Sequence, residues 1–201
     1  SGSVPLEITW MDGTVENITA VPNQRFEYFY GGGPLEETAV YDIGEVGKIT
    51  NLTHASQTIT LNRSYENPVV FAQSASNNES QAAVARVTNV QSDRFTIYLA
   101  ESSDSNGPHA SETVTYVVLE AGRHLLPDGS ALEVGLVDTA KTVGNRLSNS
   151  WESVSFESSF SATPVVLSQV QTTNGSEYLK TRYLATSGSS ILLGLEQQES
   201  I

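Results

Sequence analysis

The stretches RFTIYL (residues 94–99) and TVTYVVL (residues 113–119) decide the fold class of this chain. Both alternate apolar and polar side chains, and their apolar positions carry the β-branched and aromatic residues that suit a half-buried strand. The same pattern recurs in ESVSF (152–156) and RFEYFY (25–30), and turn-forming clusters such as SSDSNGPH (102–109) and LPDGS (126–130) separate such stretches. No window shows a capped 3.6-residue apolar period. The sequence therefore predicts an all-β fold with little or no helix.

Composition narrows the classes of function. The chain has 201 residues, no cysteine and a formal net charge of -13 at pH 7. Such an acidic protein repels nucleic acid and anionic membranes, and no apolar run is long enough for membrane insertion, so we expect neither kind of partner. Only 16% of the residues are charged although the chain is rich in Ser, Thr, Asn and Gln. This polar but weakly charged composition favours an extracellular or cell-surface location.

An internal repeat appears when the chain is aligned with itself at a shift of 96 residues. The matched pairs are Pro68, Val69 and Val70 with Pro164, Val165 and Val166, Gln73 with Gln169, Arg86 with Arg182, and Phe95, Ile97 and Leu99 with Ile191, Leu193 and Leu195. Upstream, a one-residue slip places Ile59 and Leu61 on Val154 and Phe156. The two copies therefore share at least three strands in the same order.

The repeat predicts two tandem antiparallel β-sandwiches, over residues 43–133 and 134–201. The first copy continues into the strand TVTYVVLEAG (113–122), whereas the second stops before any counterpart. A missing strand leaves backbone groups unpaired over an open core. Residues 1–42 are the candidate to complete the second repeat or a neighbouring subunit, because RFEYFYGGG followed by a Pro and an acidic strand parallels TYVVLEAG and the segment after it.

The first copy resembles the H-type lectin domain, found as repeats in large secreted microbial proteins. The resemblance is carried by PVV (68–70), VAR (84–86) with Phe95 following, and TYVVLE (115–120), and in the second copy by PVV (164–166), TR (181–182) and LLGLE (192–196). It implies a six-stranded antiparallel β-sandwich that trimerises and binds N-acetylgalactosamine or related sugars.

The positions that contact sugar in that family are changed here. The family's arginine falls on Ala82 and Tyr178, and its Trp-His pair falls on Ser102 and Ser103 in the first copy and on Gln198 and Glu199 in the second. Tyr116 stands for the tryptophan of the final strand, where core packing is the simpler interpretation. The resemblance thus supports the scaffold more than the known sugar site.

Candidate functional residues are few. With no cysteine, three histidines and no known catalytic motif, we expect a protein that is not an enzyme. The loop ESSDSNGPHASE (101–112) gathers Asp104, Asn106, His109 and Glu112, which could bind a sugar hydroxyl or Ca²⁺ through oxygen ligands; the alternative is a solvated turn in which His109 and Glu112 fix the start of a strand. No other cofactor is expected, and no resident metal.

Aromatic side chains provide the remaining candidates. Trp10 and Trp151 could stack on a sugar or pack at the rim of a sandwich. Phe26, Tyr28 and Tyr30 share one face of RFEYFY and could bury it against this chain's core or a neighbour's.

Two functions follow. The first is a non-catalytic adhesion module that binds glycans or surface proteins. The alternative is a structural subunit that forms a homo-oligomer or filament by β-strand complementation. An accessory domain of a larger secreted enzyme would show the same sequence features.

Overall fold

The computed structural model describes residues 4–20, 28–29, 33–34, 43–101, 109–126, 128–144, 150–174 and 178–197. Across these ranges the regular structure is strand and contains no helix, which confirms the prediction of an all-β chain. None of the described residues forms a helix with the length and apolar character of a membrane span. The chain divides into two compact units, Ser1–Asp42 and Ile43–Ile201.

The described residues of the first unit form two antiparallel strand pairs. Strand β1 (Val4–Thr9) pairs antiparallel with β2 (Val15–Ala20), and β3 (Tyr28–Phe29) pairs antiparallel with β4 (Gly33–Pro34). The turn between β1 and β2 closes through a hydrogen bond of 2.8 Å from Trp10 N–H to the Thr14 carbonyl. Gly13 adopts a φ of 85° in this turn, a conformation that glycine reaches without steric cost.

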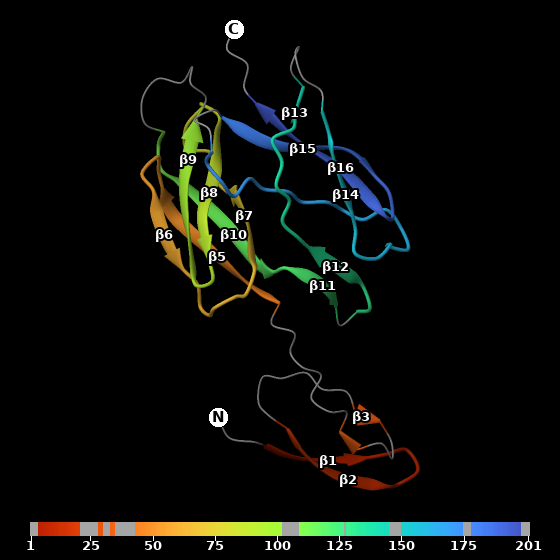
Figure 1. Ribbon diagram of the computed structural model, residues 1–201. Helices are drawn as coiled ribbons and strands as arrows, with labels where there is room; N and C mark the ends of the chain where they lie inside the picture. The colour runs from red at the N-terminus through yellow and green to blue at the C-terminus, as the bar shows by residue number, and fades with distance from the viewer. Residues whose placement is uncertain are drawn as a thin grey trace. The chain divides into compact units, whose positions relative to one another are not determined.

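The first part of the second unit is a β-sandwich of two three-stranded sheets (Figure 1). One sheet has the order β5–β10–β7 and the other has the order β6–β9–β8. Their bounds are β5 Gly44–Leu52, β6 Gln57–Thr60, β7 Pro68–Ser74, β8 Ala83–Gln91, β9 Arg94–Glu101 and β10 Glu112–Glu120. The core between the sheets is formed by alternate residues of each strand, among them Leu52, Val70, Val87, Phe95, Ile97, Leu99, Val114 and Val118.

Strand β10 is the middle strand of its sheet and holds the sheet together. It pairs antiparallel with β5 on one side and with β7 on the other. Its Tyr116 lies opposite Gly47, and a side chain at Gly47 would collide with the Tyr116 ring, so glycine is required there for the ring to cross the neighbouring strand. The same ring contacts Phe95 of the facing sheet edge-on, with 5.2 Å between the two ring centroids. Without β10, β5 and β7 would have no common partner.

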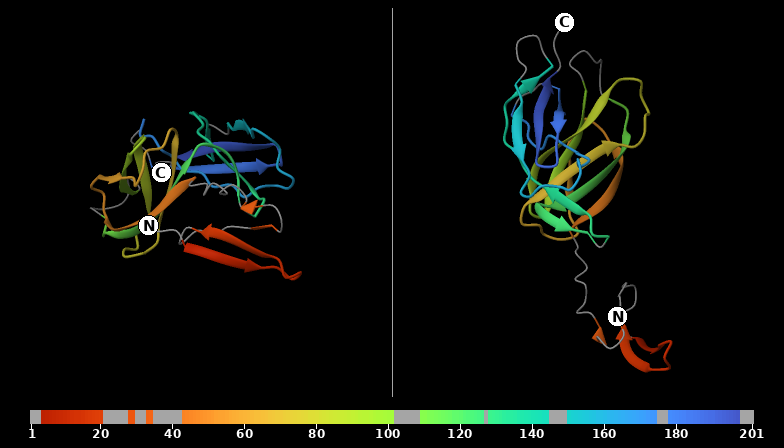
Figure 2. Two further views of the ribbon diagram at one scale, coloured as in Figure 1. Left: turned by 90° about the horizontal axis from the view of Figure 1, so that it is seen from below. Right: turned by 90° about the vertical axis from the view of Figure 1, so that its right-hand side faces the viewer.

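The second half of this unit begins after a hairpin of β11 (Gly122–Leu125) and β12 (Ala131–Val134). Its sheet consists of β13 (Thr142–Val143), β14 (Glu152–Ser155), β15 (Leu179–Thr186) and β16 (Ser190–Gln197). Strand β16 pairs antiparallel with β14 and β15, and its end forms a short parallel pairing with β13. This sheet lies beside the first sandwich (Figure 2).

The internal repeat corresponds to a repeated sheet with the same residue pairing. Arg86 pairs with Tyr98 in the first sheet, and Arg182 pairs with Gly194 in the second, which preserves the shift of 96 on both strands. On the other side of the central strand, Ile59 pairs with Phe95 in the first sheet and Val154 pairs with Ile191 in the second. These two pairs reproduce the one-residue slip seen in the sequence alignment of the copies. Sheet β14–β16–β15 is therefore the counterpart of sheet β6–β9–β8.

The second PVV segment behaves differently from the first. Residues 68–74 form strand β7, whereas the matching residues 164–170 belong to no strand. Instead, this region and residues 171–172 form hydrogen bonds with β7 and β8, which are edge strands of their sheets. Gln171 Oε1 accepts a hydrogen bond from Val70 N–H, Gln169 Nε2 donates to the Ala85 carbonyl at 3.1 Å, and Arg86 Nη2 donates to the Thr172 carbonyl at 3.0 Å. Among the described residues of the second half, no strand takes the place of β10.

Candidate functional site

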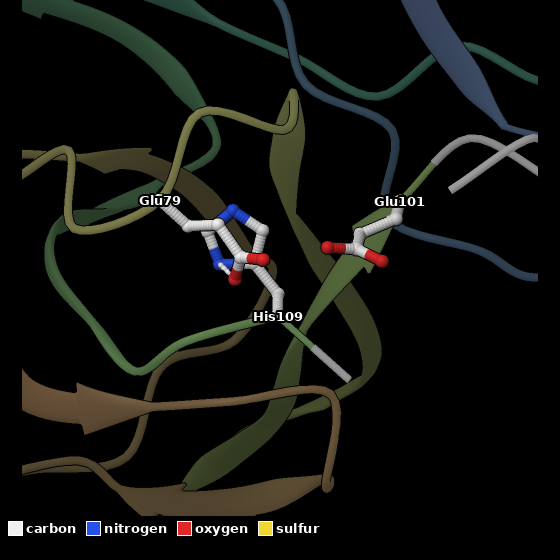
Figure 3. Close-up of side chains that lie close together, drawn as sticks. All are labelled: Glu79, Glu101 and His109. Carbon is white, nitrogen blue, oxygen red and sulfur yellow. Dashed lines mark ion pairs between the residues drawn. The ribbon is translucent and has the colours of Figure 1, made fainter. Parts of the chain in front are cut away.

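The first candidate site surrounds His109, just before β10. The ring lies beside the carboxylates of Glu79, from the loop between β7 and β8, and Glu101, from the end of β9 (Figure 3). A third carboxylate, that of Glu112, comes from the start of β10. The ring Nδ1 is 4.0 Å from a carboxylate oxygen of Glu79 and 4.0 Å from one of Glu112. Only 5% of His109 is exposed to solvent.

Both ring nitrogens of His109 face backbone acceptors. Nδ1 is 2.7 Å from the Ala110 carbonyl, and Nε2 is 3.0 Å from the Gln81 carbonyl. A neutral imidazole has one N–H, so only the protonated ring donates to both carbonyls. Burial by itself lowers the pKa of His109, but the two carbonyl hydrogen bonds and the charges of Glu101 and Glu79 outweigh it and raise the pKa above its usual value. The geometry therefore indicates a buried imidazolium.

Glu112 ties a loop to the first residues of β10. Only 2% of Glu112 is exposed to solvent. Its carboxylate accepts a hydrogen bond from Ser76 Oγ and another from Asn78 N–H at 2.7 Å. Ser76 Oγ in turn accepts from Thr113 N–H at 2.7 Å. The bond from Ser76, together with those from Asn78 and the charge of His109, lowers the pKa of Glu112 despite its burial. Glu112 thus secures the loop between β7 and β8.

The carboxylates around His109 also have the spacing of metal ligands. One ligand atom each from Glu79, Glu101 and His109 lies within 4.8 Å of the other two. A metal binds the lone pair of a neutral imidazole nitrogen. Both nitrogens of His109 are engaged with carbonyls, so metal binding would break a hydrogen bond within the loop. The arrangement fits a charge-balanced imidazolium better than a metal centre.

The structure separates the loop residues that the sequence grouped. His109 and Glu112 are buried and bonded within the protein, which favours the interpretation that they fix the start of β10. Asp104 and Asn106 lie outside the described residues, and their ligand-binding role stays a prediction. The carboxylate of Glu112 is a poor candidate for a Ca²⁺ ligand, since hydrogen bonds from Ser76 and Asn78 already engage both of its oxygens.

The two tryptophans lie at different places. Trp10 begins the turn between β1 and β2 and is partly exposed. Trp151 precedes β14, and its ring lies with the Val143 side chain over Gly194 of β16. A Cβ atom added to Gly194 would be 3.5 Å from the indole. This position favours packing for Trp151. Phe26 and Tyr30 lie outside the described residues, and for Tyr28 the structure describes only the backbone, in β3.

The second candidate site is the inner face of sheet β14–β16–β15. In the first sandwich the matching face is covered by β5–β10–β7, and Ile97 and Leu99 are buried almost completely. Their counterparts Leu193 and Leu195 are only partly buried, whereas Ile191, the counterpart of Phe95, is itself buried at 6% exposed. The contrast is larger outside the sheet, where Val69 is 4% exposed and its counterpart Val165 is 93% exposed. Equivalent apolar residues therefore lack equivalent cover.

A cavity of about 1180 Å³ lies against this uncovered face, which we call the open groove. Its apolar wall includes Val154, Phe156, Val166, Leu167, Ile191, Leu193 and Leu195. The outer face of β7 contributes Val69 and Phe71 on the opposite side. Leu167 lines the groove and is 74% exposed. A concave surface with one apolar wall and polar residues around it is a typical binding site for a partner.

The residue-by-residue reading of the sequence did not find the groove residues. Leu193 and Leu195 have the pattern of ordinary core positions, and nothing in their own segment marks them as uncovered. The signal was the repeat alignment, which matched them with core residues of a sandwich that has one strand more.

Comparison with known proteins found one curated relative. The chain is 33% identical over 134 residues to Halomucin of Haloquadratum walsbyi (strain DSM 16790 / HBSQ001), a match that covers 63% of this chain and 1% of Halomucin. The chain thus spans about one hundredth of the length of the relative it matches. It matches no protein-family profile and no solved structure.

Proposed function

We propose that this chain is a non-catalytic module of an extracellular or cell-surface protein, and that it binds a β-strand of a partner protein in the open groove. The observation that carries the proposal is the unpaired second PVV segment beside a sheet whose apolar inner face lacks a covering strand. An added strand would supply a partner for both features. Its main chain would form hydrogen bonds with the unpaired second PVV segment, and its alternate side chains would fill the groove.

The location rests on the relative and on composition. Halomucin is named as a mucin, a class of secreted and surface proteins, and 33% identity over 134 residues supports a similar location for this chain. The polar but weakly charged composition fits the same setting. An H-type lectin-like repeat as the scaffold is part of this proposal and rests on the motifs given above.

A partner strand is favoured over a glycan as the ligand. Glycan binding by the loop before β10 would use His109 and Glu112, yet both are buried and engaged in hydrogen bonds. The side of the open groove formed by sheet β14–β16–β15 is apolar, which suits the alternate side chains of a strand, and polar side chains such as Gln91, Gln171 and Asn174 line its other parts.

The test uses a labelled peptide with the sequence of residues 112–121, which contains β10. Its binding to the full chain is measured by fluorescence anisotropy. We expect Leu167→Asp to weaken binding by about tenfold or more, because a charge would enter an apolar contact. Val46→Asp is the matched control, since Val46 is 75% exposed but lies on β5 away from the residues that line the groove. Its binding should change less than about twofold.

Two results would contradict the proposal. One is a full chain that does not bind the peptide and stays monomeric by light scattering at every concentration. The other is binding of a glycan class on an array with an affinity that Leu167→Asp leaves unchanged, while the peptide does not bind.

A further inference from the structure

The first sandwich shows what kind of strand the open groove needs. There, β10 places Val114 and Val118 in the core, and between them Tyr116 meets Phe95 edge-on. The groove has Ile191 at the position of Phe95. Because isoleucine is smaller than phenylalanine, the groove has more room at this position than the first sandwich has, and a large inward side chain opposite Ile191 would fill it.

One segment of this chain carries side chains of that kind. Residues 25–30, RFEYFY, carry Phe26, Tyr28 and Tyr30 at alternate positions, so a β conformation presents three rings on one face. The described part of the segment, Tyr28–Phe29, is already extended and forms a short ladder with Gly33–Pro34. Its place in the chain also matches, because it precedes β5 as β10 precedes the second half.

Charge adds a second line of support. The described residues that line the groove include no lysine or arginine and three acidic side chains, of which Glu133 already pairs with Arg123 at 2.9 Å and Glu66 and Asp138 form no ion pair among the described residues. The aromatic segment begins with Arg25, and its Glu27 lies on the face opposite the three rings. An arginine at the acidic rim and aromatic rings over the apolar floor are complementary to the groove.

We propose, on the basis of the function proposed above, that the groove of one copy is occupied by residues 25–30 of a second copy. Phe26, Tyr28 and Tyr30 then face Ile191, Leu193 and Leu195. Donor and acceptor are different surfaces of the same chain, so the contact is heterologous and joins copies head to tail into a filament or a closed ring.

The absence of native cysteine allows a direct test by disulfide trapping in the full chain. Tyr28→Cys and Leu193→Cys are prepared as separate single variants, mixed in reduced form and then oxidised. We expect a disulfide between Cys at 28 of one molecule and Cys at 193 of the other, identified by mass spectrometry of the linked peptides. Phe29→Cys is the matched control because consecutive residues of a β-strand alternate between its two faces. It should give less than about a tenth of the cross-linked product, since a disulfide needs Cβ atoms about 4 Å apart.

The remaining outcomes are decisive as well. Equal yields of cross-linked product from Tyr28→Cys and Phe29→Cys would overturn the inference. A yield from Tyr28→Cys no higher than the background given by free cysteine would overturn it as well. A single chain that carries both Tyr28→Cys and Leu193→Cys tests the intramolecular alternative. If it forms only a monomeric disulfide at all concentrations, the strand belongs to the same copy and the inference is wrong.

Peptide competition separates this inference from the proposed function. If an unlabelled peptide of residues 24–31 displaces the labelled peptide of residues 112–121, both proposals are supported. A second outcome is that the labelled peptide of residues 112–121 binds, the peptide of residues 24–31 does not displace it and no cross-link forms. In that case the groove binds a strand from another source, and only this inference fails. If neither peptide binds, both proposals fail.

Discussion

At the scale of single residues, the clearest feature is a charged histidine inside an acidic protein. His109 donates to two carbonyls while carboxylates of Glu79, Glu101 and Glu112 surround it. A buried ion is tolerated only when it is paired and hydrogen-bonded, and this site meets both conditions. Its protonation should therefore be linked to folding.

The pH dependence of stability follows from the direction of two pKa shifts. The pKa of His109 is raised on folding, so its contribution is complete below the unfolded value near 6.5 and is lost as the pH rises through the folded value. The pKa of Glu112 is lowered, so its contribution is present above about 4.5 and is lost as the pH falls. We expect His109→Gln to remove the loss of stability on the alkaline side, as measured by urea midpoints at several pH values. The exposed His54 provides the control, and His54→Gln should leave the alkaline loss intact.

At the scale of elements, the same sheet occurs twice under different cover. Strands β9 and β16 have matched positions and matched pairing partners, yet Ile97 is fully buried whereas Leu193 is partly exposed. The stabilisation from an apolar side chain grows with the area removed from water. Equivalent residues should therefore differ in what their removal costs.

This difference can be measured with a matched pair of variants. Ile97→Ala should lower the opening free energy of β9 by about 2–5 kcal/mol, the usual cost of truncating a buried aliphatic side chain. Leu193→Ala should lower that of β16 by only about 1 kcal/mol in dilute solution, because less apolar area is buried there. Hydrogen exchange of the strand amides measures each sheet separately. Equal losses in the two sheets would show that the groove is already filled in the isolated chain.

At the scale of the whole molecule, net charge is the dominant property. A formal charge of -13 on 201 residues produces self-repulsion that opposes the compact state. The ion pairs of the described residues offset only part of it; Glu196, for example, binds Lys180 at 2.7 Å and Arg182 at 2.6 Å. Salt should therefore stabilise this protein by screening.

We expect the urea midpoint to rise between 0.05 and 1 M NaCl, roughly the range in which the Debye length falls from over 10 Å to about 3 Å. Lys48→Glu, on the exposed face of β5, makes the net charge more negative by two and should lower the free energy of unfolding at low salt by up to about 1 kcal/mol, which lowers the urea midpoint. The two proteins should converge at high salt. A gap that persists at 1 M NaCl would indicate a lost local contact of Lys48 instead of net repulsion.

The sequence by itself determined the all-β class, the strands predicted at 94–99, 113–119 and 152–156, which the structure places at 94–101, 112–120 and 152–155, and the repeat whose pairing recurs at a shift of 96. These depend on alternation within a segment, which is a local property. Only the tertiary structure decided that His109 and Glu112 are buried, and that residues 164–170 form no strand although their match at 68–74 does. Burial depends on what other segments cover, and a ladder needs a partner on its edge. Residues 68–74 have that partner in β10, and the identical PVV of the second copy has no β10 beside it among the described residues.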